Sequence, residues 1–334
     1  MKMAIRKIGV AVLALAMVLS SVVCLTVGIT ASAENGEIIS DFVILNDYQT
    51  YMADFKDYAA AKEDIILTSA NLNPASTVKI SAEPIYEESN CIVFENEGDK
   101  AIFDVVAPEN GKYNLKFDYA ALQGGTAMDI QLTIYVDGEI LWDSMQKLEL
   151  LRWWKNSKDE WTVDRYGDQV APEQTEVFAF HTQYAFDKTG VENEYYQIPL
   201  SAGTHRIEVV LKQEPFALKA FSLTAPENVK KFIELEKELA KYEEYKGKDI
   251  VIQGEDANEK NNISLTAKSD SLSAGVEPQS PYNNVINYVG GDTWNEPMQT
   301  LDGILKLKRA GFTKSECILS KAALLMEAFT VGLE

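Results

Sequence analysis

The segment from residue 148 to residue 176 holds the side chains best suited to contact a small ligand. It carries three of the five tryptophans of the chain, beside basic, acidic and phenolic groups. Indole faces suit the C–H faces of sugar rings, while guanidinium and carboxylate groups hydrogen-bond hydroxyls. The segment is long and lies between predicted strands, and long loops on a rigid scaffold often carry binding residues. The candidate ligand-binding residues are Arg152, Trp153, Trp154, Trp161, Asp164 and Tyr166.

A second interpretation of these tryptophans stays open, in which they cap a protein core under a long crossover. Trp153 and Trp154 are adjacent. Neighbouring residues of an extended chain point to opposite faces, so at most one of this pair is clearly directed outward.

Catalytic patterns are absent from the sequence. Its only two histidines, His181 and His205, are interpreted as a strand residue and a turn residue. No G-x-S-x-G, H-E-x-x-H, C-x-x-C or P-loop motif occurs. The carboxylates are numerous enough for a glycosidase but follow no motif, so we predict a protein that is not an enzyme.

The elements that position these residues are predicted to be antiparallel strands. Apolar residues alternate with polar ones over 101–120, 130–142 and 200–211, and Asp-Gly and Ala-Gly turns separate such runs. A period of two is typical of half-buried antiparallel strands. Strands are expected from Val78 to about Leu223. The sequence therefore predicts a mainly β protein built on an antiparallel β-sandwich.

Two helices are predicted to flank this sandwich. Residues 46–61 place an aromatic and apolar stripe on one helical face, with Asn46 or Asp47 as the N-cap. Core packing is favoured over a ligand surface for that stripe. Residues 226–247 begin with proline and end with glycine, which indicates a charged connector helix.

After the connector the strand pattern restarts, which predicts an incomplete second β-sandwich over 248–334. Glu83 and Glu255 lie at equivalent starts of the two arrays. Carboxylates there could help to hold calcium through oxygen ligands, and an ordinary exposed glutamate is the alternative. Residues 303–334 turn basic and helix-like, and a shifted reading frame would replace them with an alternating strand pair.

The first 33 residues have the pattern of a cleaved secretion signal, with a basic start, an apolar run and Ala31-Ser32-Ala33 before the expected cut. An uncleaved membrane anchor is the alternative.

The formal net charge of −20 becomes −23 when the three basic signal residues are lost. This charge opposes binding to nucleic acid. Cys91 and Cys317 would be the only cysteines left after cleavage. A secreted or cell-surface chain without a disulfide framework must be stabilised by its hydrophobic core. The predicted divisions are 1–33, 34–225, 226–247 and 248–334.

The strand sequences also resemble a known family. The runs over 78–83 and 91–120 are similar to the opening of jelly-roll carbohydrate-binding modules of the galactose-binding-like class. The longer string through I-Y-V-D-G-E, L-L-R-W-W, D-R-Y-G-D-Q-V-A-P-E-Q-T-E and Y-V-G-G-D-T-W resembles the amino-terminal region of large extracellular solute-binding proteins of Gram-positive ABC sugar transporters. This resemblance spans about residues 41–300.

The resemblance implies glycan binding at the cell surface, with a transporter permease as a partner. It also implies a calcium ion near the opening glutamate in some relatives, matched here by Glu83 or Glu255. The two-lobed α/β domain that would follow in such proteins does not appear in this sequence, which puts transport by this chain in doubt. An accessory glycan-binding domain severed from a glycoside hydrolase is the alternative.

Overall fold

The computed structural model describes residues 45–226, 253–273 and 275–302, together with the isolated positions 233, 234, 237 and 240. The predicted secretion signal, most of the predicted connector helix and residues 303–334 lie outside the described residues. Within the described part, no helix is long and apolar enough to cross a membrane.

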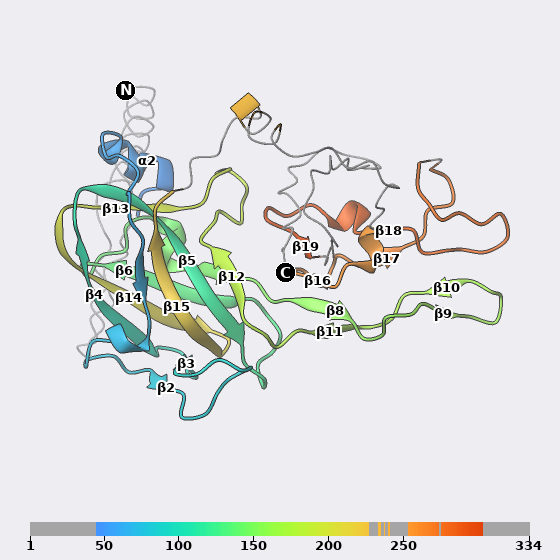
Figure 1. The fold of residues 1–334 in the computed structure, drawn as a ribbon, viewed down its shortest axis with the longest axis horizontal. Coiled ribbons are helices and arrows are strands. Elements are labelled where there is room, and N and C mark those ends of the chain that lie inside the picture. The colour runs from blue at the N-terminus through green and yellow to red at the C-terminus, as the bar shows by residue number, and fades with distance from the viewer. Residues whose placement is uncertain are drawn as a thin grey trace, which may run out of the picture. The chain divides into compact units, whose positions relative to one another are not determined.

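Two antiparallel sheets form the main body of the described chain (Figure 1). The larger sheet has seven strands in the order β12-β5-β15-β3-β2, and β1 adds to β15 while β13 adds to β5. Its strands are β1 (Ile65–Leu67), β2 (Lys79–Ile80), β3 (Ile92–Phe94), β5 (Gly111–Ala121), β12 (His181–Tyr184), β13 (Gln197–Leu200) and β15 (Phe216–Thr224). The smaller sheet has the order β4-β14-β6-β7. Its strands are β4 (Lys100–Ala107), β6 (Ile130–Val136), β7 (Leu148–Leu150) and β14 (Gly203–Gln213).

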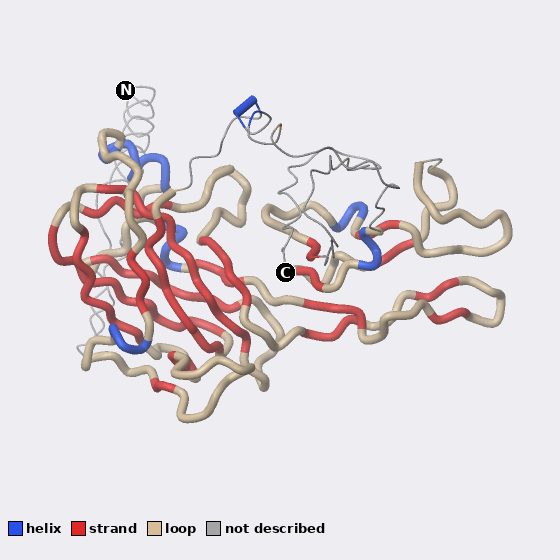
Figure 2. Tube along the Cα trace, viewed as in Figure 1, coloured by secondary structure: helices blue, strands red, loops and turns tan. Residues whose placement is uncertain are grey.

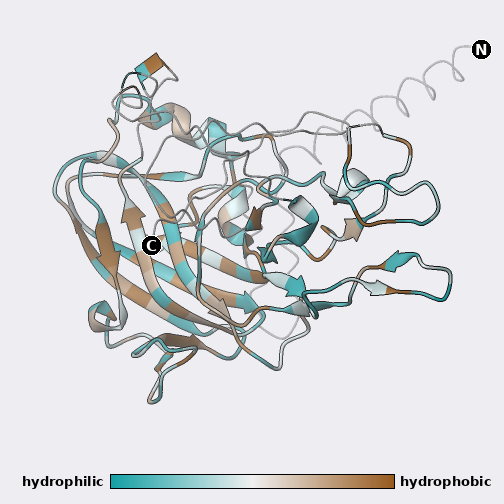
Figure 3. Ribbon diagram, turned by 45° about the vertical axis from the view of Figure 1, so that its right-hand side comes forward, coloured by the Kyte–Doolittle hydropathy of each residue, from teal (hydrophilic) through white to brown (hydrophobic). Residues whose placement is uncertain are grey.

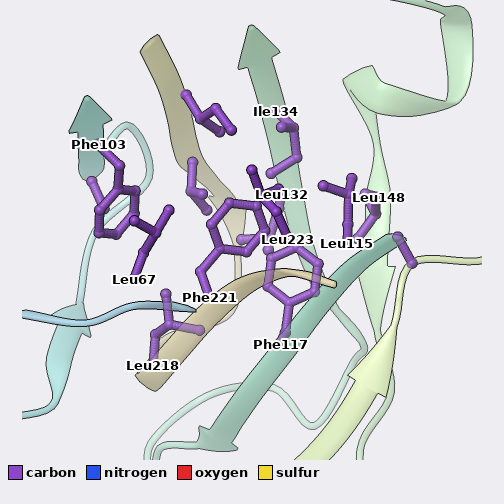
Figure 4. Packing of buried hydrophobic residues seen from close by; sticks show 14 of the residues in the cluster. Leu67, Phe103, Leu115, Phe117, Leu132, Ile134, Leu148, Leu218, Phe221 and Leu223 are labelled. Atoms are coloured by element: carbon purple, nitrogen blue, oxygen red, sulfur yellow. The ribbon is translucent and has the colours of Figure 1, made fainter. Parts of the chain in front are cut away.

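The hydrophobic core lies between these sheets because strands such as β4, β6 and β7 alternate buried residues with more exposed ones, while β3 and β15 are buried almost throughout. The strands in Figure 3 show this as alternating hydrophobic and hydrophilic bands. Phe221 of β15 packs with its ring centroid 5.0 Å from that of Phe117 and 6.1 Å from that of Phe103, which lies on β4 of the other sheet (Figure 4). Face-to-face packing of two antiparallel sheets over one core defines a β-sandwich, and this confirms the predicted fold class.

A tight turn at Asp137-Gly138 follows β6. Both residues have positive φ, 54° and 85°, and Val136 pairs with Glu139 across them. A two-residue turn of this kind requires the left-handed region at both central positions, which glycine adopts freely and aspartate tolerates. The turn predicted from the Asp-Gly pair is confirmed.

The leading helix is shorter than the predicted range of 46–61. Helix α2 spans Tyr48–Met52, and a 3-10 turn follows over Ala53–Phe55. Asp47 caps α2, since its side chain accepts the N–H of Thr50 at 2.8 Å. The helix ends early because Ala61 donates its N–H to the Lys112 carbonyl at 3.0 Å, which draws the chain onto the edge of β5. Tyr48 and Tyr51 pack against the core, as predicted.

A long hairpin, here called the tryptophan hairpin (residues 153–177), leaves the sandwich after β7. It pairs β8 (Trp154–Asn156) with β11 (Gln174–Glu176), and β9 (Thr162–Val163) with β10 (Gln169–Val170). Figure 2 shows these paired strands between stretches of loop. The segment expected as a loop therefore contains two short pairs of antiparallel strands.

The tryptophan hairpin is paired with the C-terminal segment (residues 253–273 and 275–302). Strand β16 (Glu259–Lys260) joins β8 and also pairs with β19 (Leu301–Asp302), which gives the sheet order β11-β8-β16-β19. Strands β17 (Ala267–Lys268) and β18 (Tyr288–Val289) form a separate pair. The remaining 3-10 turns are Ser69–Asn71, Asp143–Gln146, Gly254–Asp256 and Gly291–Thr293.

Two expectations about the limits of the sandwich have different outcomes. The first strand begins at Ile65, earlier than the predicted Val78. The sequence did not reveal β1, because a strand of three residues is too short to show a period of two. The predicted second sandwich over 248–334 stays a prediction. Its described residues form strands of two residues each, and β16 of this region pairs with the hairpin of the first module.

Candidate functional site

A pocket of about 360 Å³ lies where the tryptophan hairpin meets the C-terminal segment. This volume is at the lower end of the range of about 300–1,000 Å³ typical of small-ligand sites. The hairpin contributes Trp161 and Gln169, and the facing segment contributes Glu255 and Ile286. The other lining residues are Gln253, Asp256, Glu277 and Pro278. The structure thus brings together two predicted site residues, Trp161 and Glu255, which are far apart in the sequence.

Glu255 is a buried carboxylate in this pocket. It lies in the 3-10 turn Gly254–Asp256, and only 6% of it is exposed. Burial raises the pKa of Glu255, and the nearby Asp256 carboxylate raises it further. Within the described residues, no basic side chain forms an ion pair with it. A buried carboxylate without a cation is costly, so this group is available to a ligand.

Gln169 holds the two walls of the pocket together. Its backbone N–H donates to the Asn284 carbonyl at 2.9 Å, and its side-chain oxygen accepts the N–H of Ile286 at 2.8 Å. The side-chain NH₂ group of a glutamine offers two donors. Among the described residues none accepts a hydrogen bond from this NH₂ group, so it can donate to a ligand hydroxyl.

A larger hollow of about 480 Å³ lies on the smaller sheet, but its charged groups already have partners, including Glu208, which pairs with Lys100. His205 contacts the Asp137 carboxylate at 2.7 Å, and the Arg206 guanidinium donates to Asp104 at 3.0 Å. No aromatic side chain lines it among the described residues. We therefore place the candidate site in the pocket at Trp161.

Arg152 lies inside the protein, with 2% of its surface exposed. Its guanidinium pairs with Glu176 of β11 and with Glu214, the latter at 2.7 Å. Glu214 also accepts the N–H of Thr126 at 2.9 Å. A Cβ atom at Gly125 would lie 2.1 Å from a Glu214 oxygen, which explains the glycine there. Because the guanidinium is committed to these carboxylates, we leave Arg152 out of the binding site proposed below.

The side chains of Trp153 and Trp154 have different surroundings, as expected for adjacent residues of an extended chain. The Trp153 ring stacks on the His181 ring with centroids 4.3 Å apart and planes 5° apart. His181 in turn contacts the Glu259 carboxylate at 2.8 Å. Trp153 is therefore covered on one face, and it links the sandwich to the C-terminal segment.

Trp154 is half-buried within the four-stranded sheet. Its cross-strand partners are Glu176 on β11 and Lys260 on β16. Burial lowers the pKa of Lys260 to about 8. Trp154 thus lies in the four-stranded sheet of the hairpin, and both its role as a ligand contact and the alternative of capping the sandwich core stay predictions.

Asp164 and Tyr166 lie at the tip of the tryptophan hairpin. The Asp164 carboxylate accepts the N–H groups of Tyr166 at 2.8 Å and Asp168 at 3.0 Å, which shapes the turn between β9 and β10. Tyr166 is 68% exposed, and the Arg165 guanidinium lies 4.5 Å from its ring centroid. Neither residue lines the pocket, so as ligand contacts both stay predictions.

Calcium binding at Glu83 or Glu255 also stays a prediction. Glu83 is exposed after β2, and Glu255 is buried in the pocket, so the two proposed equivalents have different surroundings. In the parts of the chain that the structure describes, no three acidic, histidine or cysteine side chains gather as a metal site would need. If calcium is held, chelation will lower the melting temperature, because a ligand that binds only the folded state stabilises it. An unchanged melting temperature after chelation would argue against the ion.

Most of the pocket lining came from residues that the sequence did not single out. Gln169, Gln253, Asp256, Glu277 and Ile286 belong to polar stretches without periodicity or motif. The one available signal was composition, since the hairpin and the region after the connector are both rich in amide and acidic side chains.

No model of a known protein family matches the sequence, and no curated protein matches it. Among solved structures, the chain is similar to a family 35 carbohydrate-binding module from Clostridium thermocellum, with 14% identity over 49% of this chain and 100% of that chain, and a TM-score of 0.29. It is also similar to a carbohydrate-binding module of a Cellvibrio mixtus lichenase in complex with cellotriose, with 12% identity over 50% of this chain and 100% of that chain, and a TM-score of 0.30.

A third similar structure is a Podospora anserina β-(1,4)-mannanase that carries a family 35 module. Identity is 14% over 50% of this chain, and the TM-score is 0.32. The match spans 29% of the length of the mannanase. None of these three structures is a solute-binding protein. We draw no functional conclusion from similarity at this level.

Proposed function

We propose that this protein binds a glycan, without cleaving it, in the pocket at Trp161. The observation that carries the proposal is the composition of this pocket: one half-buried indole, two glutamines and a buried carboxylate without an ion-pair partner in the described chain. An aromatic surface combined with a few convergent polar groups is what recognition of a hydroxyl-rich ring needs.

The rigid body that carries the pocket favours a binding role. The tryptophan hairpin is anchored at its base by the buried Arg152–Glu214 pair and by the pairing of Trp154 with Lys260 of β16. Further out, the hydrogen bonds of Gln169 to Asn284 and Ile286 connect it to the facing segment. Such contacts on both walls favour a pocket whose shape changes little on binding. Preorganisation of this kind lowers the entropy cost of binding.

The setting of this domain has two candidates. One is the amino-terminal part of an extracellular solute-binding protein for sugar uptake, with a permease as partner. The other is an accessory glycan-binding domain of a glycoside hydrolase. The neighbouring gene sequence discriminates between them, since permease genes favour uptake and a catalytic domain in frame favours the hydrolase. In both settings we place the protein outside the cell or at its surface.

Replacing Trp161 with alanine is expected to weaken glycan binding roughly 10- to 30-fold, which is about 1.4–2 kcal/mol. The physical reason is the loss of the one aromatic face that the described residues contribute to the pocket. Glycan-array screening of the full chain would identify a ligand, and isothermal titration calorimetry would then compare Trp161→Ala with the unmodified protein.

Tyr282→Ala supplies a matched control for that experiment. Tyr282 is 91% exposed and does not line the pocket, so its removal should leave the affinity unchanged. Trp161→Phe should retain part of the affinity, because an aromatic face remains. Equal affinity of Trp161→Ala and the unmodified protein would place any glycan site elsewhere.

A further inference from the structure

The charges around the Trp161 pocket point to a more specific ligand, and this inference rests on the proposed function. We propose that the pocket prefers a glycan with a positively charged amino sugar, in which the ammonium group is held by Glu255. Two observations carry this step: the sign of the charges that line the pocket, and the absence of a cation beside its buried carboxylate within the described parts of the chain.

The lining of the pocket is acidic in every charged position. Glu255 is buried at its floor, and Asp256 and Glu277 are exposed at its rim. Among the described residues, no lysine, arginine or histidine lines it. Carboxylates of one sign raise the local concentration of a cation and oppose the entry of an anion such as a uronic acid.

Glu255 differs from the two other buried carboxylates of the described chain, because neither a cation nor a set of hydrogen-bond donors compensates its burial there. Glu214 lies 2.7 Å from the Arg152 guanidinium, and Asp187 accepts backbone N–H bonds from Thr189, Val191 and Glu192. Glu255 has only its own backbone N–H as a donor there. An ammonium group that entered the pocket would complete the ion pair that the described residues do not supply.

A divalent metal ion fits this arrangement of side chains less well than an ammonium group does. A divalent cation needs several oxygen ligands at about 2.0–2.6 Å, and the described carboxylates are not grouped in that way. An ammonium group on a sugar ring needs only one carboxylate in contact with it. The carboxylates of Asp256 and Glu277 at the rim can attract it from a greater distance. The ring itself would then lie against Trp161, and the Gln169 amide would donate to a hydroxyl.

The test uses three trisaccharides with the same β-1,4 backbone that differ at the second carbon of each ring. Cellotriose carries a hydroxyl there, the chitin trimer carries a neutral acetamide, and the chitosan trimer carries an ammonium. Calorimetry with the full chain should show the tightest binding for the chitosan trimer, by about 10- to 100-fold, as expected for a hydrogen bond to a charged group. This preference should shrink with added salt.

Glu255→Gln should remove that preference, because it lowers the affinity for the chitosan trimer far more than the affinity for the two neutral trimers. The variant also has a pH signature. Because Glu255 must be ionised to hold the ammonium, affinity of the unmodified protein should rise with pH through the raised pKa of Glu255 and fall when the amine loses its proton. Glu255→Gln should lose the rise on the acidic side.

Glu97→Gln is the matched control, because it removes one exposed carboxylate in another turn. It should leave the affinity for every trimer unchanged. The melting temperature of Glu255→Gln should not fall, since the substitution removes an unpaired buried charge.

Each result bears on one of the two claims. Equal affinity for all three trimers that is lost in Trp161→Ala would overturn the amino-sugar preference and leave the glycan site in place. A chitosan preference that survives Glu255→Gln, or that disappears on chelation of calcium, would also overturn the inference. Failure of all three trimers while the glycan array shows another ligand sensitive to Trp161→Ala would do the same.

Discussion

Arg152→Met is expected to destabilise the fold by about 3–5 kcal/mol, measured as the free energy of unfolding in urea. The guanidinium is buried and pairs with both Glu176 and Glu214. Its removal leaves two carboxylates without a cation in a region of low dielectric constant. A loss of this size is a large fraction of the 5–15 kcal/mol that typically stabilises a folded protein.

The structural role of Arg152 can be separated from a role in binding. Arg165→Met removes an exposed guanidinium from the same hairpin and should change stability by less than about 0.5 kcal/mol. Combining Arg152→Met with Glu176→Gln and Glu214→Gln should recover part of the lost stability, because no unpaired charge remains. If Arg152→Met instead unfolds like the unmodified protein and loses glycan binding, Arg152 contacts the ligand after all.

Phe221→Ala is expected to cost about 3–5 kcal/mol, again measured by urea unfolding. Phe221 is fully buried between the two sheets and contacts Phe117 and Phe103. Truncation removes apolar surface from the core and leaves a cavity that the two sheets close only in part. The effect reports on the interior of the sandwich and not on the pocket.

Lys219→Ala on the same strand provides the comparison for Phe221. Lys219 is exposed, and its ammonium contacts the Glu88 carboxylate at 2.6 Å. Exposed ion pairs contribute about 0–1 kcal/mol. A cost for Phe221→Ala as small as that for Lys219→Ala would mean that the two sheets are not packed as described here.

The sandwich was predictable because its information is local. Alternation along 101–120 and 200–211 specifies which face of each strand is buried, and the structure has long strands in both ranges. The turn at Asp137-Gly138 follows from the φ values that those two residue types tolerate. The predicted length of the leading helix was wrong. The end of the predicted range, at Ala61, instead pairs with β5, and this tertiary contact cannot be inferred from the local sequence.

The candidate site was only partly predictable, for a different reason. Arg152 and Trp161 lie nine residues apart in one polar, aromatic segment, and composition gives them the same appearance. One is enclosed by Glu176 and Glu214, while the other lines a pocket with Glu255. Glu176 and Glu214 lie 24 and 62 positions from Arg152, and Glu255 lies 94 positions from Trp161, so no local pattern encodes these contacts.

The periodicity and the turn residues of the sequence therefore determined that this chain forms an antiparallel sandwich. Alternation of apolar and polar residues is visible within each strand segment, without knowledge of its partner strands. The pairing of β16 with β8, the burial of Arg152 and the meeting of Trp161 with Glu255 were decided by tertiary structure. These contacts join segments distant in the sequence, and their energies depend on which charges and apolar surfaces the folded chain encloses.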